Sequence, residues 1–153
     1  MNKINRININ LSSKTPQLTH ILLGGAICFL ASYILLSSSQ FIIHMIFFSL
    51  GLTGLLAFKE IEPALFMFVL ALVYLPSGFF SGLYTGYKIK ENLKIILIFP
   101  PIIGLTALIF LRVFSGVLVL SPEDLGRDII IPLLAGVISS YLGGYSINWK
   151  KED

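Results

Sequence analysis

Long apolar stretches without charged residues dominate this chain. The longest runs for 44 residues, from Thr15 to Phe58, and contains no Lys, Arg, Asp or Glu. Further charge-free stretches run from Pro63 to Tyr87, from Ile95 to Leu111 and from Ile129 to Trp149. One helical crossing of a hydrocarbon layer about 30 Å thick needs only ~20 apolar residues. The pattern therefore predicts an integral membrane protein with several spanning helices.

Polar or turn-forming residues divide the apolar sequence into five predicted helices. The breaks fall at 37–40, 59–62, 88–94 and before residue 129. The predicted helices cover residues 18–36, 41–58, 63–87, 95–112 or 100–120, and 129–149. They form one transmembrane domain, 18–149, between polar tails at 1–17 and 150–153. The predicted fold class is all-α, an integral membrane helical bundle of about five transmembrane helices.

Prolines refine these boundaries. Pro63 would occupy the first turn of its helix, where the missing backbone N–H costs no hydrogen bond, and Pro132 would lie near the start of the last helix. Pro76, Pro100 and Pro101 fall inside or near the interior of predicted helices, which they are expected to kink. The third and fourth helices are therefore expected to be bent.

Charge alone does not decide the topology. With five crossings, the basic N-terminal tail and the loop 88–94, which carries Lys88, Lys90 and Lys94, would lie on opposite sides. Lys and Arg normally concentrate in cytoplasmic loops. The conflict disappears if one of the first three stretches is re-entrant or merely interfacial. A four-span topology is therefore the alternative, and it would place both basic segments and the C-terminus inside.

The chain also shows a candidate internal repeat. The segment Gly51–Leu56 (GLTGLL) recurs as Gly104–Ile109 (GLTALI), a shift of 53 positions. At a shift of 58, five residues match five others: Gly78, Ser81, Gly82, Gly86 and Tyr87 match Gly136, Ser139, Ser140, Gly144 and Tyr145. Repeats over 41–87 and 95–145 would each contain two crossings and share one orientation, as parallel repeats do. The alternative is coincidence in a composition rich in Gly and Leu.

Small residues spaced four apart mark two predicted packing faces. These residues are Gly78, Gly82 and Gly86 on one helix and Gly136, Ser140 and Gly144 on another. Small side chains let membrane helices approach closely, so such ladders are typical of helix contacts. Hydroxyl residues lie beside the ladders, at Ser77, Ser81, Thr85 and Ser139. The alternative reading is that these hydroxyls line a polar path for a solute.

Arg112 is the charged residue that lies deepest in apolar sequence, and it belongs to the same candidate path. In a helix over 100–120 it would sit near mid-membrane, where ionisable groups are costly and usually functional. However, the repeat aligns Arg112 with Lys59, which ends a predicted helix. We therefore expect Arg112 to end a helix that begins near Ile95, with its side chain extending toward the headgroups.

Composition excludes several kinds of protein. Hydrophobic residues make up 56% of the chain and charged residues 12%, whereas soluble domains contain about 25% charged residues. The net charge of +3 arises in loops and tails, so we expect no nucleic-acid partner. Cys28 is the single cysteine, and His20 and His44 lie far apart in sequence, so we predict no metal site. We likewise predict no catalytic site, no cofactor and no enzymatic activity.

Two classes of function follow. The first is a structural or accessory membrane protein whose glycine and serine faces dock a membrane-protein partner or a second copy, as in a homo-oligomer. The second is a small transporter or channel with a path near Ser77, Ser81 and Thr85. The first is favoured, because ion and proton routes usually carry acidic or basic residues inside the membrane. The expected location is a prokaryotic cell membrane, which the chain crosses several times.

Overall fold

The computed structural model describes residues 15–49, 55–89, 92–118 and 125–149. These residues form helices, with no strand among them. Four of the helical segments in this part of the chain are long and apolar enough to cross a membrane: 17–49, 61–88, 93–114 and 126–147. The predicted all-α membrane bundle is confirmed, and the structure has the four-span alternative rather than five spans.

The first predicted helix and residues 41–49 of the second form one continuous helix, α2 (Thr15–Ser49), whereas residues 55–58 belong to α3 (Leu55–Val69). The polar residues 37–40 do not end it. The Ser37 hydroxyl donates to the Tyr33 carbonyl at 2.8 Å, and the Ser39 hydroxyl donates to the Leu36 carbonyl at 2.9 Å. Serine in a membrane helix can satisfy its hydroxyl on the preceding turn in this way. The expected break was therefore wrong, because neither a proline nor a glycine interrupts the backbone there.

The second span is built from α3 (Leu55–Val69), a π-helical turn η1 (Leu70–Tyr74) and α4 (Leu75–Lys88). Pro63 lies inside α3 instead of in its first turn, because α3 begins eight residues earlier than expected and includes 59–62. Pro76 follows η1 directly. Since a proline ring clashes with the carbonyl four residues earlier, which is that of Leu72, the wider π turn relieves the contact expected to kink this helix.

The second half of the chain forms the other two spans. A short helix α5 (Leu93–Ile96) precedes α6 (Phe99–Phe114), and the π turn η2 (Gly126–Ile130) leads into α7 (Ile131–Trp149). Pro100 and Pro101 lie in the first turn of α6, so the helix is interrupted before them rather than kinked. Pro132 follows η2 as Pro76 follows η1, which gives both π turns the same physical cause.

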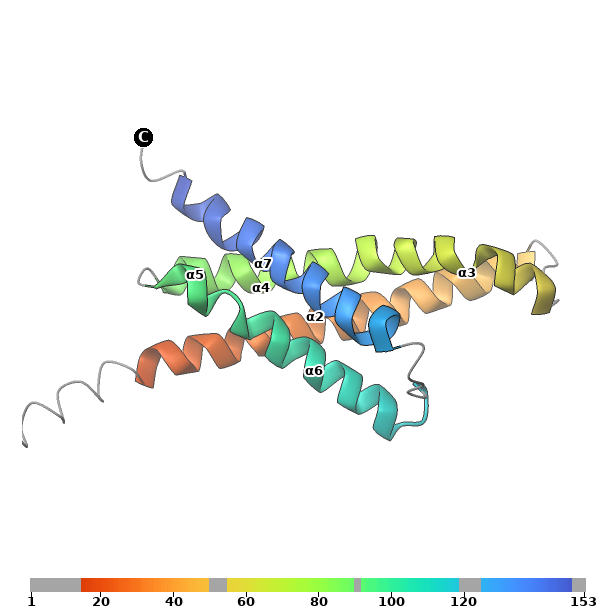
Figure 1. Cartoon of the computed structure of the whole chain (residues 1–153), viewed down its shortest axis with the longest axis horizontal. Helices are drawn as coiled ribbons and strands as arrows, with labels where there is room; N and C mark the ends of the chain where they lie inside the picture. Colours follow the sequence, from red (N-terminus) through yellow and green to blue (C-terminus); the bar gives the residue numbers. More distant parts are fainter. Residues whose placement is uncertain (1–14, 50–54, 90–91, 119–124, 150–153) are drawn as a thin grey trace, which may run out of the picture.

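The chain therefore makes two hairpins that lie side by side (Figure 1). The start of α2, the short helix α5 and the end of α7 lie at one end of the bundle, on the left in Figure 1. The start of α3 and the end of α6 lie toward the opposite end. The expectation that the N-terminus would be opposite the loop 88–94 was wrong, because α2 crosses once where two crossings were predicted.

This topology separates the charges. Segments 1–14, 88–94 and 150–153, at the end that holds the termini, carry eight basic and three acidic residues. Segments 55–62 and 112–128, toward the other end, carry three basic and five acidic residues. The positive-inside rule then predicts a cytoplasmic location for both termini.

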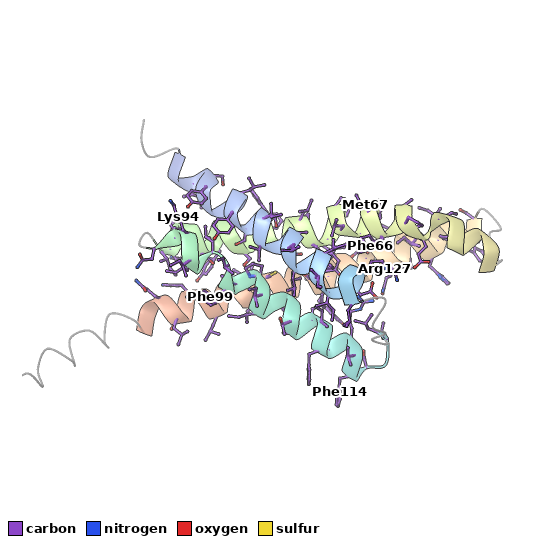
Figure 2. The ribbon with its side chains drawn as sticks, in the orientation of Figure 1. Phe66, Met67, Lys94, Phe99, Phe114 and Arg127 are labelled. Atoms are coloured by element: carbon purple, nitrogen blue, oxygen red, sulfur yellow. The ribbon has the colours of Figure 1, made fainter. Side chains whose placement is uncertain are left out.

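Small residues form the interior and large apolar residues form the exterior. Ser32, Ser77, Ser81 and Thr85 are fully buried. Large side chains such as that of Phe114, which points away from the bundle in Figure 2, cover the outside. Helices in lipid associate through close backbone packing rather than through burial of large apolar side chains. The distribution is that of a bundle in lipid.

Candidate functional site: a cavity between α2 and α3

The two glycine and serine ladders lie against each other, on α4 and α7. A Cβ atom added at Gly82 would overlap the Ser140 carbonyl oxygen and lie 2.6 Å from the Ser140 Cα. One added at Gly86 would lie 2.7 Å from the Gly144 Cα. Gly78 contacts Gly136 and Ser139 in the same way. Each ladder residue thus meets its counterpart at the shift of 58, and the two helices run parallel. The ladder faces cover each other within one chain.

The helices α2 and α6 form a second close contact. A Cβ atom added at Gly104 would lie 2.5 Å from the Gly25 carbonyl oxygen and 2.6 Å from the Cys28 Cβ. The segment 51–54, expected to be the counterpart of 104–107, lies outside the described residues. The helix on which Gly104 packs is instead α2. The packing role of Gly25 was missed in the sequence, although Gly24 and Gly25 are adjacent small residues.

The hydroxyl residues of the candidate polar path are enclosed in the α4–α7 region. Ser77 donates to the Val73 carbonyl at 2.6 Å, Thr85 to that of Ser81 at 2.9 Å and Ser139 to that of Gly136 at 3.0 Å. All of them are buried, and the Ser81 hydroxyl has no hydrogen-bond partner among the described residues. A solute could follow these hydroxyls only if the helices packed on α4 moved away from it.

Arg112 is not grouped with these hydroxyls and instead borders a cavity of about 760 Å³. The second half of α2 forms one wall and α3 forms the other. The apolar lining residues are Leu36, Ile43, Phe47, Phe48, Leu65, Phe66 and Val69. On each helix most of them are three, four or seven positions apart, and Phe48 and Phe66 directly follow Phe47 and Leu65, so each set covers one side of its helix. Two apolar stripes therefore face each other across the cavity.

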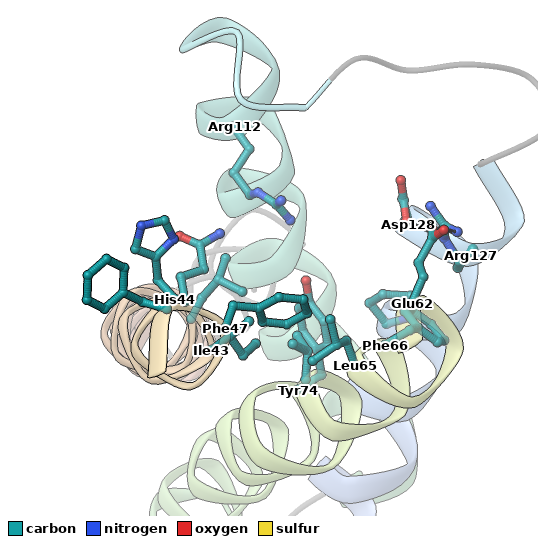
Figure 3. Close-up of a pocket in the computed structure, with 15 residues that line it drawn as sticks. Ile43, His44, Phe47, Glu62, Leu65, Phe66, Tyr74, Arg112, Arg127 and Asp128 are labelled. Carbon is teal, nitrogen blue, oxygen red and sulfur yellow. Dashed lines mark hydrogen bonds and ion pairs between the residues drawn. The ribbon is translucent and has the colours of Figure 1, made fainter. Parts of the chain in front are cut away.

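Three charged side chains at the cavity, those of Glu62, Arg127 and Asp128, lie together (Figure 3). Glu62 belongs to α3, whereas Arg127 and Asp128 belong to η2. The Arg127 Nη1 lies 2.5 Å from the Glu62 Oε1, and the Arg127 Nε lies 3.1 Å from the Asp128 Oδ1. Arg127 thus contacts two carboxylates, and its bond to Glu62 joins the two hairpins. Gln40 and His44 lie at the exposed edge, on α2.

Arg112 lies in the last turn of α6, the position that its match with Lys59 predicted. Its side chain, however, extends into the cavity (Figure 3). There it interacts with the buried Tyr74 hydroxyl of η1. The Arg112 Nε is buried and has no hydrogen-bond partner in the described part of the chain, where no carboxylate pairs with it either. A guanidinium carries five N–H donors, so Arg112 retains unused donors in this site.

The arrangement suits binding of a molecule with an apolar part and a polar end. Within the described ranges, no group of three or more His, Cys, Asp or Glu side chains could hold a metal ion. The cavity was not predicted from the sequence, because residues 41–49 were assigned to a separate helix. The spacing of Leu36, Gln40, Ile43, Phe47 could have indicated one continuous face.

Comparison of the chain with models of protein families, with curated proteins and with solved structures finds no match. The function must therefore be argued from the geometry of this chain.

Proposed function

We propose that this chain is a non-enzymatic membrane protein that binds an amphiphile from the surrounding bilayer in the cavity between α2 and α3. The proposal rests on the pair of apolar stripes that line the cavity and end at charged side chains. Cavities of about 300–1,000 Å³ are typical of sites for small molecules. A volume of about 760 Å³ is within that range.

The position of the cavity favours a molecule from the bilayer. The helices α2 and α3 continue past the end of α6, and the stripes lie on these continuing parts, which are apolar enough to lie in hydrocarbon. The cavity is not sealed, since Phe48 is 80% exposed and His44 is also exposed. An amphiphile could therefore keep its polar end near Arg112 while its chain lies between Phe47 and Leu65.

Partner docking through the ladders and solute transport would both need helix faces that are buried inside the bundle. Docking of a partner through the glycine and serine ladders would require α4 and α7 to separate, because these ladders contact each other. A path for a polar solute along Ser77 and Ser81 would require helices of the bundle to separate, because both side chains are fully buried. An accessory role remains compatible with the proposal if the bound amphiphile or another face of the bundle makes the contact.

Filling the cavity is expected to remove the bound molecule. Leu65→Trp adds an indole between the stripes, whereas Leu134→Trp adds one to a position on α7 that is 57% exposed. Each variant is purified in mild detergent, incubated with equal amounts of phosphatidylglycerol and phosphatidylcholine, and weighed by native mass spectrometry. We expect about one retained lipid, the number that a cavity of this size suits, for the unmodified protein and for Leu134→Trp.

Leu65→Trp should lose most of that lipid. Equal retention by the two tryptophan variants would contradict the proposal, as would absence of retained lipid from the unmodified protein. A melting curve of each variant in the same detergent confirms that both are folded when they are weighed.

A further inference from the structure

The two arginines that border the cavity have different surroundings. Arg127 lies between Glu62 and Asp128, at 2.5 Å and 3.1 Å, so its charge is balanced within the protein. Arg112 has the Tyr74 hydroxyl as its neighbour but no carboxylate among the described residues. Its Nε is buried without a partner. Among the described residues, Arg112 is therefore a cation that no carboxylate contacts directly.

An unbalanced, partly buried arginine is costly. A buried donor without a partner loses its hydrogen bonds to water and gains nothing in exchange. Removing a counter-charge from a buried pair is costlier still, because the remaining charge is left uncompensated. An anion from outside the chain could supply the acceptors that Arg112 does not find among the described residues. The planar guanidinium fork suits a carboxylate or phosphate, which accepts two of its hydrogen bonds at once.

We propose that the cavity selects an amphiphile with an anionic headgroup, a phosphate or a carboxylate, that binds to Arg112 and the Tyr74 hydroxyl. This inference rests on the proposed function and specifies its ligand. The chain of the amphiphile would lie between the stripes of α2 and α3. Glu62 and Asp128 both contact Arg127, which offsets one of their two negative charges. The source is the bilayer and not the aqueous phase, because the walls of the cavity are apolar.

The test compares headgroups and charges in one assay. The unmodified protein, Arg112→Gln, Arg112→Lys and Lys94→Gln are each incubated with phosphatidylglycerol and phosphatidylcholine, and the retained lipids are measured by native mass spectrometry. Lys94→Gln removes a positive charge at the opposite end of the bundle, on α5. The unmodified protein should prefer the anionic lipid about tenfold, the low end of what a charged hydrogen bond contributes. Lys94→Gln should keep that preference.

Arg112→Gln should bring the preference close to parity, and Arg112→Lys should retain most of it because the charge remains. A tenfold preference that survives in Arg112→Gln would overturn the assignment of the headgroup to Arg112. If the unmodified protein retains both lipids equally while Leu65→Trp retains neither, the cavity binds amphiphiles but the anionic specificity is wrong. If no lipid is retained, the proposed function fails as well. Displacement of the lipid by millimolar inorganic phosphate would show a site for a soluble anion and would overturn the choice of the bilayer as source.

Discussion

Replacing Gly82 with alanine is expected to destabilise the folded protein by about 3 kcal/mol, the upper end of the usual range for overpacking. The new Cβ would overlap the carbonyl oxygen of Ser140 and lie 2.6 Å from its Cα. These atoms belong to the backbone of α7, so no side chain can turn aside. α4 and α7 would have to separate, and the contacts of Gly78 and Gly86 would weaken with them. Thermal unfolding in detergent measures the loss.

Gly126→Ala is the matched control. A Cβ at Gly126 has no neighbour within 4 Å, and alanine is favoured over glycine in helices by about 1 kcal/mol. This variant should melt at the same temperature as the unmodified protein or slightly above it. Equal melting temperatures for Gly82→Ala and the unmodified protein would show that the α4–α7 contact is looser than the structure has it.

The second prediction concerns which side of the membrane the termini and loops face. Single cysteines at Ser13, Asn92 and Glu152, in a chain carrying Cys28→Ala, should all resist an impermeant thiol reagent in intact cells and react after lysis. A cysteine at Ser115, an exposed position directly after α6, should react in intact cells. The reason is the charge separation: the end with both termini carries eight of the eleven basic residues, and basic segments stay in the cytoplasm.

Each departure from this labelling pattern has a definite meaning. Protection of Asn92 together with reaction of Ser13 in intact cells would restore the five-span topology. Reaction of the three terminal and loop positions with protection of Ser115 would keep four spans but reverse their orientation. Because each site is scored as reactive or protected, the experiment gives an all-or-none answer.

The sequence was sufficient to predict the membrane class and the two packing ladders. Charge-free length determines the first, and small residues four apart determine the second, since close approach requires them in any bundle. The sequence could not show whether a ladder contacts another helix of the same chain or a partner, because spacing is identical in the two cases. The structure brings Gly82 and Ser140 together in one chain. The internal repeat itself stays a prediction.

The predicted number of helices depends on whether polar residues end a helix. The polarity of residues 37–40 predicts a break, but the hydroxyls of Ser37 and Ser39 donate hydrogen bonds to carbonyls of the preceding turn of α2. Polarity does not end a helix when the backbone hydrogen bonds can continue. A break there puts Leu36 and Phe47 on separate helices, so the sequence does not predict the cavity that they line together. Among the described residues no carboxylate contacts Arg112, and this results from tertiary packing that has no signature in the sequence.

The most direct test of the proposed site asks whether an acyl chain occupies the cavity. Phe66→Trp, in a chain carrying Trp149→Phe, places the sole tryptophan at the cavity wall. The matched reporter is Leu142→Trp in the same background, at a position on α7 that is 62% exposed. Each protein in detergent receives one equivalent of phosphatidylglycerol with brominated chains, which quench nearby tryptophan fluorescence. We expect strong quenching at position 66 and little at position 142. Equal quenching at the two positions, or no quenching at either, would contradict binding of an acyl chain in the cavity.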